Sequence, residues 1–416
     1  MESLIKKLRT NQVFLSVNGD QLDVHFDGAT LAPELIQELK THKQALIEYI
    51  QAKTTQKDYQ PIPVLPPQES YPLSSSQHRS WLLSQFEEAN PAYNMPVSFI
   101  FQGALDRSIL ERTFDTLIDR HEILRTVFKD DEHGEIRQYI KERANLGFQI
   151  VYEDLAQVSN QDQKVEPIIL REITQPFDLY HGPLIRARLI RLAPDRHLFS
   201  YVMHHIVGDA MSGDLLQQEI ALLYQAFAQE APNPLPPLRI QYKDYAAWQQ
   251  AELNSEQQQK EEAYWLKQFT GELPVLQMAT DLPRPAVKTY NGTRLYQIIP
   301  QDRIRGLKRI VEQAGCTLYM GLLGLVNTLL HRYSGQTDII LGSPISGRNH
   351  TDLKTQIGFY INTLALRTQF DAHDSFNDLL ANIKQTTIGA YEHQMYSFDE
   401  LVNQLNLKRD LSRNPL

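Results

Sequence analysis

The chain has 416 residues, of which 42% are hydrophobic, and it carries a formal net charge of -9 at pH 7. A chain of this length and composition can bury a large core and is expected to divide into two or three domains. Because the charge balance is acidic and no long run of Lys or Arg occurs, the sequence argues against nucleic acid as a partner.

Neither a membrane span nor a signal peptide is expected. The chain has no run of about 18 apolar residues, and its amino-terminal sequence lacks the apolar core of a signal peptide. We therefore expect a cytoplasmic protein without a membrane partner. The single cysteine, Cys316, lies at the start of an apolar helical stretch, where a small buried side chain is a better account than a catalytic thiolate.

Residues 1–52 are predicted to form a small unit of their own. Its expected elements are a helix around 4–8, strands at 13–17 and 22–26, and two helices between 31 and 50 with a candidate break at 40–43. Asn18-Gly19-Asp20 between the strands is typical of a hairpin turn. An exposed hairpin edge can pair with another chain. The alternative is that this unit only caps the larger domain.

A Pro-rich linker is predicted at residues 53–70, where Pro61, Pro63, Pro66 and Pro67 lie among polar residues. Such a composition favours an extended, semi-stiff spacer. Beyond it, helical and strand-like segments alternate without a repeat, which is typical of an α/β (mixed α+β) fold. A second Pro-rich stretch, 231–237, is a candidate passage between one lobe at 71–240 and another at 241–416.

The most informative segment is residues 203–213, in which two adjacent histidines are followed by Asp209. Residues 196–203 are apolar on both alternating faces and predict a buried strand that ends at the histidines. Because neighbouring side chains of a strand point to opposite faces, His204 and His205 share a pocket only if the strand has already ended. We expect one histidine to act in proton transfer and the other to pack. Taken alone, the segment is described equally well as a pair of hydrogen-bonded core histidines.

Metal-dependent and serine-dependent hydrolysis are poorer accounts of this segment. The two histidines are adjacent rather than spaced as i and i+4 on a helix, and no other close cluster of ligands appears. Around Ser212, both glycine positions of the G-x-S-x-G motif are occupied, by Ala210 and Asp214. No metal ligands are therefore expected.

Seven segments, in order, resemble the motifs of condensation domains from nonribosomal peptide synthetases. Residues 204–210 look like the HHxxxDG motif. The six others are residues 74–81, similar to SxxQxRxW; 120–128, similar to RHExLRTxF; 242–249; 357–364, similar to IGxFxNTL; 393–398; and 409–416. Seven ordered matches argue strongly against chance.

The resemblance implies a fold and an organisation. It implies two lobes like those of chloramphenicol acetyltransferase, arranged as a V, with a second lobe that is incomplete at its C-terminal end because family members continue further. Residues 1–52 look like the small α-β-β-α-α docking domains that precede some condensation domains. The implied role of such a unit is to receive the C-terminal tail of an upstream synthetase subunit, by addition of a strand at the hairpin edge.

The resemblance also implies a reaction. An acceptor aminoacyl thioester on one carrier domain attacks a donor acyl or peptidyl thioester on another, and an amide forms. Both substrates arrive on the phosphopantetheine arms of partner carrier domains, so no cofactor bound by this chain itself is expected. Amine attack on a thioester needs alignment, removal of a proton and stabilisation of an oxyanion.

The family motif assigns roles to the residues of the histidine segment. His205 matches the catalytic histidine, which acts as a general base or holds the amine by a hydrogen bond; the sequence leaves both open. His204 is expected to pack or to shape the turn, and Asp209 to fix the loop by pairing with an arginine. Ala210 replaces the usual glycine, which costs roughly 1 kcal/mol if that position needs a positive φ, or else narrows the site.

Further candidates shape the site from other segments. Arg125, Arg294 and Arg348 are candidate partners of Asp209, and the sequence does not rank them. Asn362 lies in a segment that would line the passage between the lobes, where packing is as good an account as contact with substrate.

Two other functions stay open. One is a coenzyme A-dependent acyltransferase of the same superfamily, acting on a free alcohol or amine; the docking-like unit argues against it. The other is a non-catalytic platform that only binds carrier domains, which the departure at Ala210 keeps open.

Overall fold

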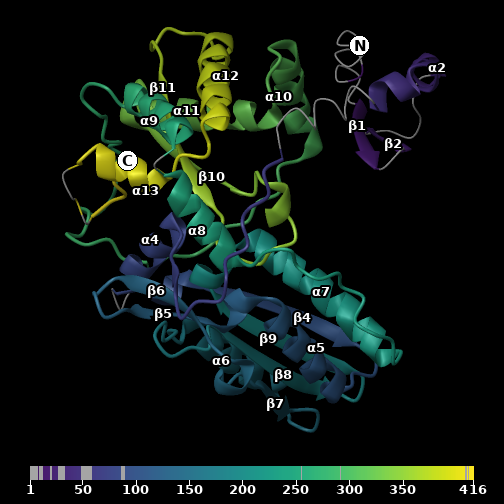
Figure 1. The fold of residues 1–416 in the computed structure, drawn as a ribbon. Helices are drawn as coiled ribbons and strands as arrows, with labels where there is room; N and C mark the ends of the chain where they lie inside the picture. Colours follow the sequence, from purple (N-terminus) through teal and green to yellow (C-terminus); the bar gives the residue numbers. More distant parts are fainter. Residues whose placement is uncertain are drawn as a thin grey trace. The chain divides into compact units, whose positions relative to one another are not determined.

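The computed structural model describes residues 8, 13–18, 21–26, 33–47, 59–85, 90–253, 255–290, 292–407, 410 and 412–416. The chain separates into two compact units, residues 1–61 and 62–416. Figure 1 shows both units.

The amino-terminal unit is built on a β-hairpin. Strands β1 (Val13–Asn18) and β2 (Gln21–Phe26) pair antiparallel with Asn18 opposite Gln21, and helix α2 (Pro33–Thr41) follows. The helix breaks at His42 and residues 43–47 are helical again. The hairpin strands and the break between the two helices are therefore confirmed.

A small apolar core holds this unit together. Its buried members are Leu8, Val13, Leu35, Leu39 and Leu46. The predicted first helix lies outside the described residues except for Leu8, which is helical, and the turn residues Gly19 and Asp20 also lie outside them.

The larger unit begins with a four-stranded sheet in the order β4 (Asn94–Gln102), β9 (Arg196–His204), β8 (Ile185–Ala193) and β7 (Ile150–Asp154). The β7–β8 pair is parallel and the other pairs are antiparallel. The predicted strand at 196–203 is confirmed as β9.

Helices cover both faces of this sheet. On one face, α5 (Arg107–Arg120) and α7 (Ala210–Ala228) pack on each other and share a core with Phe199 and Tyr201 of β9. On the other face, α6 (Gln161–Thr174) packs with Ile190 of β8 and Leu198 of β9. A central strand with both faces covered needs apolar side chains on both, which is why the sequence of β9 lacks polar alternation.

A small second sheet and two helices adjoin this core. The sheet has the order β3 (Tyr71–Pro72), β6 (Ile136–Ile140) and β5 (Thr126–Asp130). The two helices are α4 (Ser75–Ser84) and α8 (Tyr242–Glu252), and Tyr242 and Tyr245 of α8 belong to the first core.

The Pro-rich segment joins the larger unit from residue 62 onward. Ile62 is fully buried and its N–H donates to Asp352, while the N–H of Leu65 donates to Asp244 at 2.8 Å. The extended conformation expected of this segment is thus held by contacts where it is described; residues 53–58 lie outside the described part.

The remaining elements form a second core around an antiparallel pair, β10 (Asp338–Ile345) and β11 (Asn362–Gln369). The helices of this part are α9 (Glu256–Gln268), α10 (Gln301–Gln313), α11 (Leu318–Ser334), α12 (Phe376–Glu392) and α13 (Phe398–Gln404). Trp265 of α9, Leu364 of β11 and Ile383 of α12 lie at the centre of that core. Cys316 lies half-buried just before α11. The mixed α+β fold is confirmed.

One connection returns from the second core to the first. The segment between β10 and β11, residues 346–361, places Leu353, Ile357 and Tyr360 in the first core. It therefore brings late residues of the chain to the end of β9.

No single helix of the described residues is long and apolar enough to span a membrane. Helices α10 and α11 meet the requirement only when taken together, and the chain bends by 108° between them.

Candidate active site

Strand β9 ends at the first of the two adjacent histidines. A 3-10 turn, η4 (His205–Val207), starts at the second one, so the alternation of the strand does not continue past His204. The condition that the sequence set for a shared pocket, an end of the strand at this point, is met.

His204 is fully buried beneath the turn. Its Nδ1 accepts a hydrogen bond from the N–H of Ile206 at 3.1 Å, and its ring lies edge-on to Phe177. Burial lowers the pKa of His204 to about 3, because the charged form would lose its hydration. A neutral, buried imidazole that caps its own turn suits the packing role.

His205 is only partly buried. Its ring centroid lies 4.5 Å from that of Phe359 and 6.5 Å from that of Tyr93. Burial lowers the pKa of His205, while the neighbouring backbone and the Asp209 carboxylate act in the opposite direction. Its Nδ1 is buried and has no hydrogen-bond partner within the described part of the chain. The imidazole is thus neutral at neutral pH and able to accept a proton.

Asp209 caps helix α7 and pairs with an arginine. Its Oδ1 accepts from the N–H of Ser212 at 2.8 Å, which satisfies a free donor of the first turn. Nη2 of Arg348 lies 3.1 Å from the same oxygen, and both charged side chains are at least 97% buried. Of the three arginines that the sequence left unranked, the structure selects Arg348.

The Asp209 cap also holds the returning segment. The Ser212 hydroxyl lies 2.7 Å from Oδ1 of Asp209 and 2.8 Å from the carbonyl of Gly358, and it accepts from the N–H of Gly358. The N–H of Tyr360 donates to Oδ2 of Asp209 at 3.2 Å. The start of α7 and residues 358–360 are therefore one hydrogen-bonded bracket.

Arg348 and Tyr242 complete this bracket. Nη1 of Arg348 donates to the carbonyls of Leu353 and Gln356, both at 2.6 Å, and the Tyr242 hydroxyl donates to the carbonyl of Phe359 at 2.6 Å. Residues from positions 209 to 360 are thus joined in one buried network, which we call the Asp209 bracket.

Two glycines allow parts of the Asp209 bracket to pack closely against the backbone. A Cβ at Gly358 would lie 1.9 Å from the ring of Tyr242, and a Cβ at Gly347 would lie 1.9 Å from the carbonyl oxygen of Tyr360. Gly347 also has a φ of +65°, which side chains disfavour.

Ala210 does not carry the strain considered for it. It is the first residue of α7, it is exposed, and the non-glycine residues with positive φ in the described part are Asn160, Glu230 and Asn406. The backbone cost expected for a positive φ is therefore absent.

The other arginine candidates do not pair with Asp209 in this structure. Nη1 of Arg125 donates to the carbonyl of Lys141, and Nη2 lies 3.5 Å from Glu122, so Arg125 is not the partner of Asp209. Arg294 is exposed.

Asn362 fastens the start of β11 to the chain before α13. Its Nδ2 donates to the carbonyls of Gln394 and Tyr396, and its Oδ1 accepts from the N–H groups of Thr363 and Phe398. The structure thus gives the Asn362 side chain four hydrogen bonds to the backbone.

Sequence reasoning missed three residues that line or hold the site. Phe359 stood inside a recognised motif at a position without a fixed identity, and Ser212 stood three residues after Asp209, a spacing typical of a helix cap. Nothing in the sequence marked Tyr93, because its contact with the histidines depends on strand pairing.

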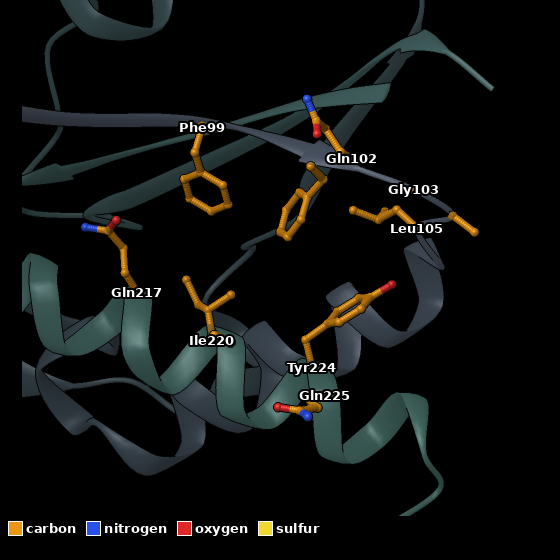
Figure 2. A pocket seen from close by; sticks show the side chains of 11 residues that line it. Phe99, Gln102, Gly103, Leu105, Gln217, Ile220, Tyr224 and Gln225 are labelled. Carbon is orange, nitrogen blue, oxygen red and sulfur yellow. The ribbon is translucent and has the colours of Figure 1, made fainter. Parts of the chain in front are cut away.

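One pocket lies elsewhere, between β4 and α7. Its volume is about 370 Å³, and Figure 2 shows Phe99 of β4 across from Ile220 and Tyr224 of α7. The other side chains around it are neutral as well: Phe101, Gln102, Leu105, Gln217, Ala221 and Gln225, together with Gly103 and Ala104. No charged group or histidine lines it, so the pocket offers no side chain that titrates near neutral pH.

The described residues contain no candidate metal site. Within the residues that the structure describes, no three His, Cys, Asp or Glu side chains are grouped so that they could hold a metal ion.

Comparison with known families decides where the chain belongs. The model of the condensation domain matches residues 67–416, and the model of the TubC N-terminal docking domain matches residues 1–51. The chain belongs to the condensation-domain family. Condensation domains of nonribosomal peptide synthetases use substrates carried on phosphopantetheine, and a docking domain implies a partner synthetase subunit.

Curated relatives are peptide synthases that are much longer than this chain. The condensation domain with its docking domain is 41% identical over 375 residues to gramicidin S synthase 2 of Brevibacillus brevis, which covers 90% of this chain and 8% of that protein. It is 43% identical over 358 residues to tyrocidine synthase 3 of Brevibacillus parabrevis, covering 86% of this chain and 5% of that protein. The chain spans less than a tenth of the length of these relatives.

Solved structures share the fold. The X-domain from teicoplanin biosynthesis superposes with a TM-score of 0.77 at 26% identity, covering 86% of this chain and 78% of that one. The first condensation domain of the calcium-dependent antibiotic synthetase superposes with a TM-score of 0.64 at 23% identity, covering 81% and 78%.

Proposed function

We propose that this chain catalyses amide-bond formation between a donor acyl or peptidyl thioester and an acceptor aminoacyl thioester, each held on a carrier domain. The observation that carries the proposal is the partly buried, neutral His205 beside a buried bracket that fastens the returning segment 346–361 to the first core. A rigid scaffold below a proton acceptor suits a reaction whose main demand is alignment.

The chemistry assigns one step to each group. The acceptor nitrogen attacks the thioester carbon, a C–N bond forms and the C–S bond breaks. His205 takes the proton of the attacking nitrogen and returns it to the departing thiolate of the donor arm. Because Nδ1 is buried, we assign Nε2 to the substrate.

The bracket around Asp209 is assigned a structural role. Its carboxylate already accepts from Ser212, Tyr360 and Arg348, so no lone pair directed at the substrate is needed. We propose that it holds residues 358–360 against the turn that carries His205, and that Ala210 is compatible with activity.

We further propose the division of the chain. Residues 1–52 dock the C-terminal tail of an upstream subunit at an edge of the β1–β2 hairpin. Residues 53–70 link this docking domain to two lobes, residues 71–240 and 241–416. Helix α8 of the second lobe packs on the core of the first.

The decisive experiment is reconstitution with loaded carriers. Purified donor and acceptor carrier domains bearing aminoacyl thioesters are mixed with the chain, and the dipeptidyl thioester is followed by mass spectrometry. We expect product that falls at least about 100-fold with His205→Ala, as general-base removal implies. The matched control is His133→Ala, because the His133 side chain is 76% exposed and contacts only its neighbour Glu132 among the ion pairs.

Each of the other outcomes contradicts the role of His205 or supports another function. Product that is unchanged by His205→Ala overturns the role of this histidine. Coenzyme A turnover without carriers supports the acyltransferase. Carrier binding without product supports the platform, a second candidate because the X-domain from teicoplanin biosynthesis, with a shared fold, has also been solved in a complex with OxyB.

A further inference from the structure

Two aromatic side chains from distant parts of the chain flank the His205 ring. Phe359 lies at 4.5 Å between ring centroids with an interplanar angle of 56°, and Tyr93 lies at 6.5 Å with an angle of 73°. Phe359 comes from the connection between β10 and β11, and Tyr93 ends the 3-10 turn η1 (Asn90–Tyr93) before β4. His205 therefore contacts one aromatic ring from a segment that precedes it in the sequence and one from a segment that follows it.

The exposure of these rings separates them from ordinary core packing. Phe199 and Tyr201, which pack in the core on β9, are fully buried, whereas Phe359 and Tyr93 are both partly exposed, as is His205. Large aromatic side chains that stay partly exposed beside a partly exposed imidazole form the wall of an open site.

The backbone holds Phe359 in place without help from its own side chain. The neighbouring residues Gly358 and Tyr360 are bonded to Ser212 and Asp209, and the carbonyl of Phe359 accepts from Tyr242. A change of the Phe359 side chain thus leaves the Asp209 bracket intact, and the contact can be tested without breaking the fold.

Tyr93 touches both histidines. Its ring stacks at 6.2 Å from that of His204 and lies edge-on to His205. Burial raises the pKa of the Tyr93 hydroxyl, with Tyr290 and Asp399 acting in the same direction and Arg79 against them. Tyr93 is therefore a neutral ring at working pH.

We propose that Phe359 and Tyr93 are positioning residues that clamp the His205 imidazole in one side-chain rotamer, so that Nδ1 stays buried and Nε2 faces the acceptor amine. The catalytic consequence rests on the proposed function; the clamp itself does not. The rings also displace water from the imidazole and so help to keep it neutral.

The groups that can influence the charge of His205 are few. On its own segment they are His204 and Asp209, the latter paired with Arg348. Tyr93 faces it from η1. The segment 357–361 contributes no Asp, Glu, Lys, Arg or His. Loss of the Phe359 ring therefore acts on His205 through water and rotamer freedom, without removing a charge.

The first test is spectroscopic and needs no substrate. In protein labelled with ¹⁵N-histidine, the His205 ring signals are assigned by their loss in His205→Ala and followed with pH. In Phe359→Ala we expect the pKa of His205 to move up toward its ordinary value of about 6.5 and the tautomer populations to change. Phe359→Leu, which keeps apolar bulk, restores most of the wild-type behaviour, and Tyr93→Leu changes the signals in the same direction as Phe359→Ala.

The structure offers a matched control. Phe370 contacts the ring of His331 at 5.4 Å in the second core, so Phe370→Ala should move the His331 signals and leave those of His205 unchanged. His205 signals that are the same in wild type, Phe359→Ala and Tyr93→Leu overturn the clamp, whatever the activity.

The second test is kinetic. With loaded carriers, we expect Phe359→Ala to lower kcat by about 10- to 100-fold, because misplacement of a reacting group acts on the chemical step, while KM for the acceptor carrier changes less than about 3-fold. A change in KM alone overturns the positioning role. If wild type forms no product, the proposed function fails and the spectroscopic test still decides the clamp.

Discussion

Removal of the Arg348 side chain is the sharpest test of how the returning segment 346–361 is held on the first core. Its guanidinium is 3% exposed, lies 3.1 Å from Asp209, which is 1% exposed, and donates to the carbonyls of Leu353 and Gln356. Arg348→Ala leaves a buried carboxylate without its counter-charge and two carbonyls without this donor. The loss of one partner of a buried pair costs about 3–5 kcal/mol.

That magnitude is a large part of the whole stability, since domains unfold with free energies of about 5–15 kcal/mol. Urea unfolding followed by tryptophan fluorescence should show a markedly lower midpoint for Arg348→Ala. The midpoint of Arg348→Lys should lie between those of wild type and Arg348→Ala, because lysine keeps the charge but lacks the several N–H donors of the guanidinium. The control is Arg107→Ala, whose pair with Glu111 is about half exposed and is worth roughly 0.3–0.5 kcal/mol.

A double-mutant cycle isolates the pair itself. Asp209→Ala combined with Arg348→Ala should cost less than the sum of the single changes, because the double variant leaves no unpaired buried charge. An additive cycle, or an Arg348→Ala midpoint equal to that of Arg107→Ala, would refute the reasoning.

Three further predictions concern stability and tolerance. The pKa of His204 is about 3 in the folded chain and about 6.5 in the unfolded chain, so the unfolded state binds more protons between these pH values. The free energy of unfolding should therefore fall as the pH drops from 6.5 toward 3. His204→Gln should make this pH dependence shallower in urea titrations, and an unchanged slope would contradict the prediction. Gly358→Ala should destabilise the fold by more than about 2 kcal/mol, because its Cβ would clash with Tyr242. Gly306→Ala, in open space on α10, should stabilise the fold by up to about 1 kcal/mol. Equal urea midpoints for the two variants would count against the close packing at Gly358. Ala210→Gly should lower the melting temperature slightly through helix propensity and leave product formation within about 3-fold, and a large gain in product would show that the methyl group obstructs the site.

Local pattern was sufficient for much of the fold. The hairpin β1–β2 follows from two strand-like segments around a turn signal, and the buried strand β9 follows from apolar residues on both faces. These features depend on residues near one another in sequence, for which side-chain periodicity is a direct record of burial. The end of β9 at His204 was predictable for the same reason.

The motif at residues 204–210 also indicated a candidate for the reactive side chain. It assigned His205 to the chemistry and Asp209 to an arginine, because these roles need residue types at a fixed short spacing. It left open which arginine, since nothing local distinguishes Arg125, Arg294 and Arg348.

Only the tertiary structure decided the partners that come from afar. Arg348 lies 139 residues from Asp209 in sequence, and Phe359 and Tyr93 reach His205 from opposite directions along the chain. Such contacts follow from the return of residues 346–361 onto the first core and from the pairing of β4 with β9. The sequence by itself determined which side chain we propose to carry the proton. The packing of distant segments decided which residues surround that side chain, because periodicity records burial but not the identity of the neighbour.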